Sequence, residues 1–112
     1  MKVLWCWRCK MDLPMLDEVE YEEVRELYSQ CMRATKEFRE KHGLPLSKID
    51  MKERFKPVCD AYERLTGRKE TVANAVMHHR IALYGPPCTK CGRVLRTSKS
   101  NKCFECGQPA IN

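Results

Sequence analysis

The sequence lacks long apolar runs, internal repeats and low-complexity tracts. No stretch approaches the roughly 20 apolar residues of a membrane-spanning helix, so we expect no membrane partner. The apolar residues that precede Arg8 and Lys10 are too few for the core of a secretory signal peptide. We therefore expect a cytoplasmic protein.

The length of the chain also limits what it can do. Its 112 residues have room for one modest hydrophobic core, so a large enzyme cleft is not expected. Charged residues make up 32% of the chain, and apolar residues recur among them at regular intervals. This composition indicates a folded protein rather than a disordered one. We expect no organic cofactor.

Cysteine is the residue type that the chain has in abundance, with eight copies. Thiols stay reduced in the cytoplasm, so this content favours metal binding over disulfide bonds. Near the carboxyl end, Cys88 pairs with Cys91 and Cys103 with Cys106, and eleven residues separate the pairs. Each pair can place two thiolates at two corners of a tetrahedron around zinc. Two disulfides or four unused thiols are the alternative.

The segment around these pairs, about residues 86–108, resembles a zinc ribbon, and the resemblance implies a closed structural zinc held by the four cysteines. The whole chain is similar to small bacterial zinc-ribbon proteins. The residues between the pairs fit a short hairpin with Val94 and Leu95 on a strand. Gly92 and Gly107 each follow a pair, where the chain must bend so that backbone amides point at sulfur. So short a segment needs metal binding to fold, which supplies on the order of 10 kcal/mol.

Apolar residues at helical spacing predict three helices in the rest of the chain. The first is expected to begin near Glu18, because Asp17 is a natural N-cap and Glu20 follows three residues later. One face of this helix is apolar and must be buried, and it consists of Val24, Leu27, Tyr28, Cys31, Thr35 and Phe38.

The second helical segment runs from Met51 to Leu65, and Pro57 is expected to kink or break it just before that residue. A third, shorter helix is predicted roughly from Val72 to Tyr84. A glycine follows each of the three helical segments, and we expect each glycine to take the left-handed conformation that ends a helix. These glycines are Gly43, Gly67 and Gly85.

A further cysteine pair, Cys6 and Cys9, lies in the sequence WCWRC. A Trp-Cys-x-x-Cys sequence is typical of thioredoxin-like oxidoreductases. Such a dithiol follows a strand and opens a helix, whereas this one begins at residue 6 and is followed by Pro14, which breaks a helix. A second zinc site is the better interpretation, and its further ligands are expected among His78, His79, Cys31 and Cys59.

The candidate second site consists of Cys6 and Cys9 with His78 and His79, of which at least one histidine is expected to be a ligand. Neighbours on a helix point about 100° apart, so one of the two histidines is expected to face the cysteine pair. The other candidates, Cys31 and Cys59, are expected to be buried core residues. The remaining histidine, His42, is expected to act as a cation at a helix end.

An open site made of Cys6, Cys9, one histidine and a water would have the geometry of a catalytic zinc. No carboxylate is tied to this pair by its spacing, so the sequence identifies no general base. We therefore expect a non-catalytic protein and keep a zinc hydrolase-type site as a minor alternative.

Basic residues gather around the C-terminal cysteines, where the sequence has five basic residues and one acidic residue, Glu105. Four thiolates and one Zn²⁺ leave a charge of −2, so part of this positive charge neutralises the metal centre. Phosphate contacts are a second role, and the candidate contacts are Arg93, Arg96, Lys99 and Lys102. Trp5 and Trp7 are stacking surfaces for bases if they are exposed, although packing beside the cysteine pair is the interpretation we favour.

These observations predict a mainly α protein of three helices with an N-terminal cysteine knuckle and a C-terminal zinc-ribbon β-hairpin. We expect residues 1–85 to form the helical domain with the knuckle and residues 86–112 to form the zinc ribbon. The predicted function is that of a non-catalytic zinc-binding protein, in which Zn²⁺ supports a nucleic-acid-binding or regulatory interaction. A protein adaptor that makes no nucleic-acid contact is the alternative.

Overall fold

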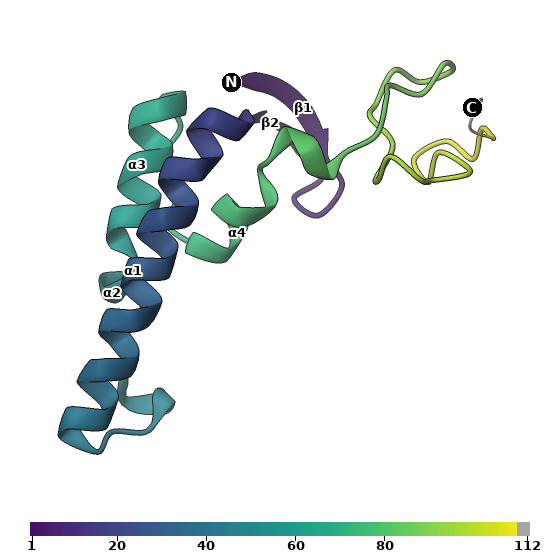
Figure 1. The fold of residues 1–112 in the computed structure, drawn as a ribbon. Coiled ribbons are helices and arrows are strands. Elements are labelled where there is room, and N and C mark those ends of the chain that lie inside the picture. Colours follow the sequence, from purple (N-terminus) through teal and green to yellow (C-terminus); the bar gives the residue numbers. More distant parts are fainter. Residues whose placement is uncertain (110–112) are drawn as a thin grey trace.

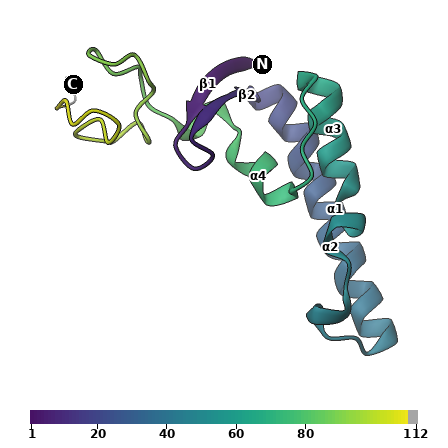
Figure 2. The same cartoon turned by 180° about the vertical axis from the view of Figure 1, so that it is seen from behind.

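The computed structural model describes residues 1–109 of the chain. The chain starts with a β-hairpin, continues as the long helix α1 and returns through shorter helices to a segment that lies beyond the hairpin (Figures 1 and 2). We call residues 86–109 the C-terminal segment. The last three residues of the predicted zinc ribbon, 110–112, lie outside the described residues. Among residues 1–109, no helix is both long and apolar enough to cross a membrane.

Strands β1 (Lys2–Cys6) and β2 (Met11–Met15) form the N-terminal hairpin. They pair antiparallel in a register that places Cys6 opposite Met11. A strand before Cys6 was not expected from the sequence, and that expectation was wrong. A strand rather than a helix follows Cys9, however, so the arrangement still differs from that of a thioredoxin-like dithiol.

Helix α1 (Glu18–His42) begins at the predicted residue. Asp17 and Glu20 form the expected capping box, because the Glu20 amide donates to the Asp17 carboxylate at 2.8 Å and the Asp17 amide donates to the Glu20 carboxylate at 3.0 Å. Gly43 ends the helix in the predicted left-handed conformation, with a φ of 63°. The sequence next to each end of α1 therefore fixes where the helix starts and stops.

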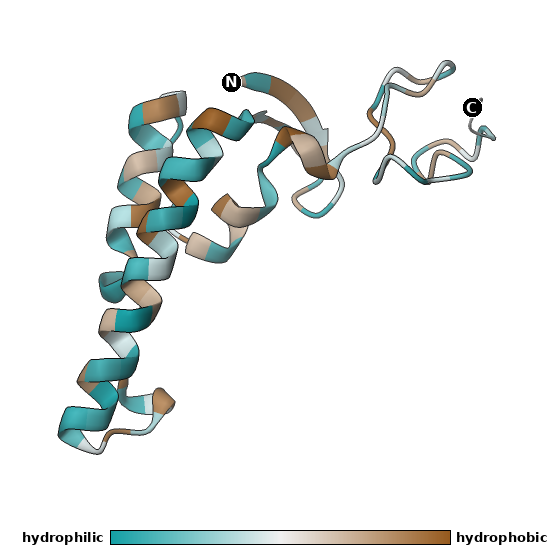
Figure 3. Ribbon diagram, in the orientation of Figure 1, coloured by the Kyte–Doolittle hydropathy of each residue, from teal (hydrophilic) through white to brown (hydrophobic). Residues whose placement is uncertain are grey.

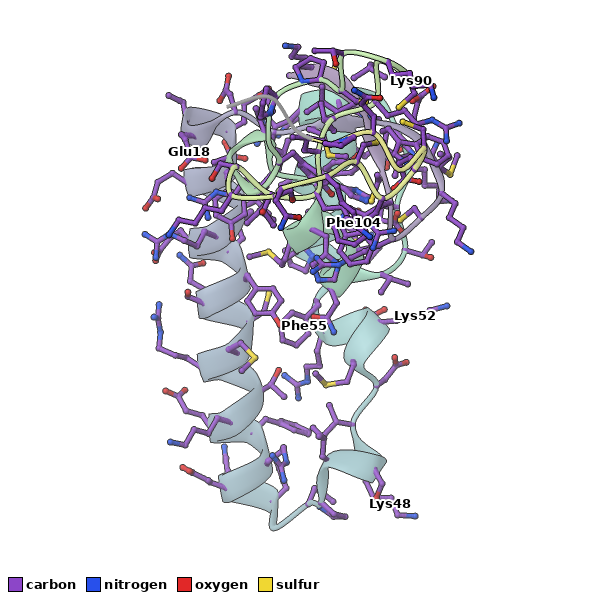
Figure 4. The ribbon with its side chains drawn as sticks, turned by 90° about the vertical axis from the view of Figure 1, so that its right-hand side faces the viewer. Glu18, Lys48, Lys52, Phe55, Lys90 and Phe104 are labelled. Carbon is purple, nitrogen blue, oxygen red and sulfur yellow. The ribbon has the colours of Figure 1, made fainter. Side chains whose placement is uncertain are left out.

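The second helical segment is divided as Pro57 predicted. Helix α2 (Met51–Arg54) ends at Phe55, and α3 (Lys56–Thr66) carries Pro57 in its first turn, where a missing N–H costs no hydrogen bond. The Phe55 ring lies 5.1 Å from the ring of Tyr28 on α1, on the inner side of the helices (Figure 4).

Helix α3 packs along α1 and closes the main hydrophobic core (Figure 1). Figure 3 shows most of the hydrophobic residues of α1 in the half against which α3 and α4 lie, whereas its C-terminal end is hydrophilic. The buried members of this helical core are Leu16, Val24, Cys31, Phe55, Val58, Cys59, Ala61, Tyr62 and Val76.

The prediction for the third helix was wrong in length, and the described residues form four α-helices instead of three. Helix α4 (Ala73–His78) is followed by the short 3₁₀ helix η2 (Ile81–Leu83). The chain leaves the helix at His79 because it pairs with Leu16. The Leu16 amide donates to the His79 carbonyl oxygen at 2.8 Å, and the Ile81 amide donates to the Leu16 carbonyl oxygen at 3.0 Å.

The C-terminal segment forms two isolated bridges among its described residues, in place of the predicted β-hairpin. Pro87 pairs with Val94, and Lys102 pairs with Pro109. Val94 is nevertheless buried as a strand residue would be, because its side chain enters a second hydrophobic core in the N-terminal hairpin. The other buried members of that core are Cys6, Leu13, Met15 and Tyr84.

Two arginine–tryptophan contacts also hold the C-terminal segment on the hairpin. The Arg93 guanidinium lies 3.7 Å from the ring centre of Trp5, and the Arg96 guanidinium lies 4.4 Å from that of Trp7. Both tryptophans are half-buried. Such contacts contribute about 0.5–2 kcal/mol each, so they reinforce the apolar contact made by Val94.

Gly67 takes the predicted left-handed conformation with a φ of 79°, whereas Gly85 does not. Gly85 is required for a different reason. A Cβ atom at this position would lie 2.3 Å from the Thr97 carbonyl oxygen, and the Gly85 amide donates to the Leu95 carbonyl oxygen at 2.9 Å. The absence of a side chain lets the C-terminal segment fold back against its own connection to η2.

We predict that Gly85→Ala displaces the C-terminal segment from the hairpin, because the added methyl group overlaps a backbone oxygen, at a cost of about 1–3 kcal/mol. Tryptophan fluorescence measures this directly, since the chain has two tryptophans and both lie under arginines of the segment. The control Gly43→Asn alters the far end of α1 and should leave the emission unchanged. Unchanged emission in Gly85→Ala would contradict the proposed packing.

Candidate metal centres

The N-terminal centre consists of three side chains that meet between the hairpin and the end of α4. Cys6 ends β1, Cys9 lies in the hairpin turn, and His79 follows α4. The ligand atoms of all three lie within 4.8 Å of one another, and Cys9 Sγ is 3.5 Å from His79 Nε2. Sulfur and nitrogen atoms bound to one tetrahedral zinc are separated by about 3.6 Å, given bonds of about 2.3 and 2.1 Å. The observed spacing therefore fits a shared metal ion.

His79 is held in place by its backbone and by packing. Its carbonyl oxygen accepts the hydrogen bond from Leu16, its ring lies 5.6 Å from that of Tyr62, and its side chain is fully buried. Burial lowers the pKa of His79, because the buried imidazolium loses its hydration. The ring is therefore neutral near pH 7, which is the form that binds metals.

Cys6 is also fully buried, and its surroundings stabilise a thiolate. Burial by itself raises the pKa of Cys6, but hydrogen bonds from the Tyr84 hydroxyl and from the amides of Cys9 and Arg8 outweigh it, so the pKa is lowered. The Tyr84 hydroxyl lies 3.5 Å from Cys6 Sγ and 3.0 Å from the His78 carbonyl oxygen. It has one proton and donates to one of them at a time.

The C-terminal centre consists of Cys88, Cys91, Cys103 and Cys106, whose sulfur atoms lie within 4.8 Å of one another. Cys88 Sγ is 3.7 Å from Cys106 Sγ, and Cys91 Sγ is 3.6 Å from Cys103 Sγ. A disulfide bond would require about 2.05 Å. Thiolates on one tetrahedral zinc lie about 3.8 Å apart when each bond is about 2.3 Å. The spacing is that of a zinc-ribbon-like site and not that of disulfides.

The two turns that carry these cysteines have the same backbone geometry. Gly92 and Gly107 take left-handed φ values of 79° and 83°, and each donates its amide to the carbonyl oxygen of the first cysteine of its pair, at 2.9 and 2.7 Å. The Lys90 amide lies 3.4 Å from Cys88 Sγ. Amides of Cys91 and Lys90 lower the pKa of Cys88 to about 6, because they stabilise its thiolate.

The remaining candidate ligands lie outside both centres. The His78 ring is not among the atoms that meet at the N-terminal centre, although it is adjacent to His79 in sequence. Cys31 and Cys59 are buried in the helical core. His42 lies at the end of α1, where its ring is 4.5 Å from that of Phe38. The choice of His79 over His78 follows from the bridge to Leu16, which sequence spacing does not reveal.

Two of the four candidate nucleic-acid residues, Arg96 and Lys102, belong to a row of alternating cations and aromatic rings that joins the hairpin to the C-terminal segment. Arg8 and Arg96 lie 4.6 and 4.4 Å from the Trp7 ring centre, and Arg96 and Lys102 lie 4.9 and 5.0 Å from that of Phe104. We call these five residues the cation–aromatic row. Phe104 was missed in the sequence, although its position between two cysteines of a metal-binding turn was a usable signal.

Both centres can bind a metal ion and both are compatible with Zn²⁺. Comparison of the chain with protein-family models, curated proteins and solved structures finds no match. The functional assignment therefore depends on the chemistry of the two centres and of the surface around them.

We predict two zinc ions per chain, measured by elemental analysis of protein freed from loosely bound metal. Cys6→Ser and Cys103→Ser should each bind one zinc ion, because each removes a ligand from a different centre. Cys31→Ala is the matched control, since this cysteine lies in the helical core, and it should keep two. Two ions in Cys6→Ser would show that the N-terminal centre is assigned incorrectly.

The two adjacent histidines allow a sharper test. His79→Gln should weaken zinc binding at the N-terminal centre by more than about 100-fold, because the loss of a ligand costs more than the 10- to 100-fold effect of an outer hydrogen-bond partner. His78→Gln should leave the affinity unchanged. Competition with a chromophoric chelator measures both, and equal losses in the two variants would refute the geometry.

Proposed function

We propose that the protein is a non-catalytic zinc-binding module in which a structural zinc at the C-terminal centre supports the binding of single-stranded nucleic acid. The observation that carries this proposal is Phe104, which is 52% exposed although it is a large aromatic residue flanked by two cations. An exposed ring of this kind offers a stacking surface for a base, and neighbouring cations offer contacts for the phosphates on either side.

The charge of the C-terminal segment supports the same partner. Five basic residues against one acidic residue give it +4, which four thiolates and one Zn²⁺ reduce to +2. Glu105 is already paired with Arg96, with Arg96 Nε 3.5 Å from its carboxylate. Lys99 and Lys102 are exposed and have no acidic partner among the described residues, so they are available for phosphate.

The two arginines among the predicted contacts have a different role. Arg93 and Arg96 lie on Trp5 and Trp7 and hold the C-terminal segment against the hairpin. Substituting them would change the packing of the segment as well as its charge. The lysines are therefore the informative residues for a test of nucleic-acid binding.

Zinc contributes by fixing the conformation of the turn that contains Phe104. Phe104 follows Cys103 directly and precedes Cys106 by two positions, so both anchors of its turn are ligands of the C-terminal centre. Two backbone hydrogen bonds support the turn: the Gly107 amide donates to the Cys103 carbonyl oxygen, and the Cys103 amide donates to the Gln108 carbonyl oxygen. Without metal, the ring loses its fixed position relative to Arg96 and Lys102, and binding should be lost.

The test is the affinity for a fluorescently labelled single-stranded oligonucleotide, measured by anisotropy at several salt concentrations. Affinity should fall steeply with salt, by about 0.7 logarithmic units per logarithmic unit of salt for each phosphate contacted. Phe104→Ala should weaken binding by roughly 5- to 150-fold, which corresponds to about 1–3 kcal/mol for one stacked base. Lys99→Glu with Lys102→Glu should weaken it further and reduce the salt slope.

Lys48→Glu with Lys52→Glu provides the matched control. It makes the same change in net charge at η1 (Leu46–Lys48) and α2, away from the C-terminal segment (Figures 1 and 4). The control should bind nearly as well as the wild type. If both double variants lose affinity equally, the attraction is a property of net charge alone and the proposed surface is wrong.

A protein adaptor is the second candidate, and a cleft of about 310 Å³ between the helices favours it. Its lining is largely apolar, and Met51 and Val72 remain 40% and 48% exposed beside it. Exposed apolar surface beside a cleft is a feature of protein contact sites. Weak oligonucleotide binding that does not depend on salt would favour the adaptor over nucleic-acid binding.

A further inference from the structure

The two metal centres differ in the number of ligands that the protein supplies. The C-terminal centre has four cysteines and so completes the tetrahedron of a structural zinc. The N-terminal centre has Cys6, Cys9 and His79, which is one ligand fewer. Three protein ligands with an open fourth position are the arrangement of zinc sites that exchange a ligand with solvent.

The described residues provide no fourth ligand at this position. Among residues 1–109, no further histidine, cysteine, aspartate or glutamate atom joins the three within 4.8 Å. Residues 110–112 are alanine, isoleucine and asparagine, which are none of those four residue types. The other ligands predicted from the sequence do not complete this centre. Cys59 belongs to the helical core, and the His78 ring lies outside the group.

Two of the three ligands are buried and held in place, and the third is exposed to solvent. Cys6 and His79 are fully buried, and His79 is aligned by its backbone pairing with Leu16. Cys9 is exposed at the hairpin turn. A small molecule can therefore approach the metal from the side of Cys9, while the buried ligands keep their positions.

Two charged side chains of opposite sign, Arg68 and Glu70, act on Cys9 at this side. Zn²⁺ with two thiolates and a neutral imidazole has no net charge, so one added anion makes the centre negative. Arg68 lies nearby, with Nη2 3.8 Å from Met11 Sδ in the hairpin, and its buried Nε atom has no hydrogen-bond partner. Burial, the Cys6 contact and the Glu70 carboxylate raise the pKa of Cys9, and the Arg68 guanidinium lowers it. A guanidinium with an unused N–H at the hairpin can stabilise an incoming anion.

We propose that the N-terminal centre is an open zinc site whose fourth position holds an exchangeable water and accepts a small thiolate in its place. Thiolate is the expected class because zinc favours sulfur ligands and because the unused N–H of Arg68 can stabilise the single added charge. This property is independent of nucleic-acid binding, which depends on the other centre.

Cadmium-113 NMR of the metal-loaded full chain tests the proposal, with 2-mercaptoethanol as the probe ligand and ethylene glycol as the control additive. Two resonances are expected, because four sulfur ligands and two sulfurs with one nitrogen give different environments. His79→Gln identifies the resonance of the N-terminal centre. The thiol should move that resonance in a saturable way and leave the other in place, and ethylene glycol should move neither.

Two results would overturn the proposal. A resonance of the N-terminal centre that does not move with the thiol would mean that its fourth position is closed, and a wild-type spectrum with one resonance would mean that the centre binds no metal. Arg68→Gln should weaken the apparent thiol affinity by roughly 2- to 5-fold, as expected for one exposed ion pair. Lys69→Gln removes the same charge from the exposed neighbouring residue and should have no effect, so equal effects would exclude the role of Arg68.

Discussion

The C-terminal segment depends on what holds its four cysteine sulfur atoms together, and coordination of a cation is the interaction that their geometry fits. Four sulfur atoms lie within 4.8 Å of one another at the C-terminal centre, and as thiolates they would repel one another without a positive charge between them. The apolar support within the segment is small, since its own buried cluster contains Leu95 and the sulfur-bearing Cys88 and Cys103. Zinc binding of about 10–16 kcal/mol is large enough to order such a segment, whereas burial of one leucine contributes about 1.5–3 kcal/mol.

The same coordination links parts of the chain that are distant in sequence. The N-terminal centre joins the hairpin to the residue after α4, so a metal there connects the first strand to the helical part. The C-terminal centre shapes the segment that places Arg96 on Trp7 and Val94 in the hairpin core. The hairpin therefore supplies two ligands of the N-terminal centre and packs against the segment that carries the C-terminal centre. The arginines of that segment cover the hairpin tryptophans, which are half-buried.

The parts of the fold that sequence reasoning predicted are those that local chemistry determines. Asp17 and Gly43 define α1, Pro57 separates α2 from α3, and the cysteine spacing identifies the four-cysteine group. The errors arose where distant residues pair. The bridge from Leu16 ends α4 early and selects His79, and Gly85 is needed for a close approach to Thr97 that no helix signal contains. The cation–aromatic row was missed for the same reason, because its members come together only when the C-terminal segment packs on the hairpin.

Amide hydrogen exchange with and without bound metal tests this dependence most directly. In the zinc-loaded protein, the amides of Cys88, Gly92, Cys103 and Gly107 should be protected, because each donates a backbone hydrogen bond in the two metal-binding turns. After complete chelation under reducing conditions, those four amides should exchange at the rate of an unfolded chain, while the amides in the centres of α1 and α3 keep most of their protection. Protection of the four turn amides that survives chelation would contradict the account, because something other than a thiolate-bound cation would then hold the segment together.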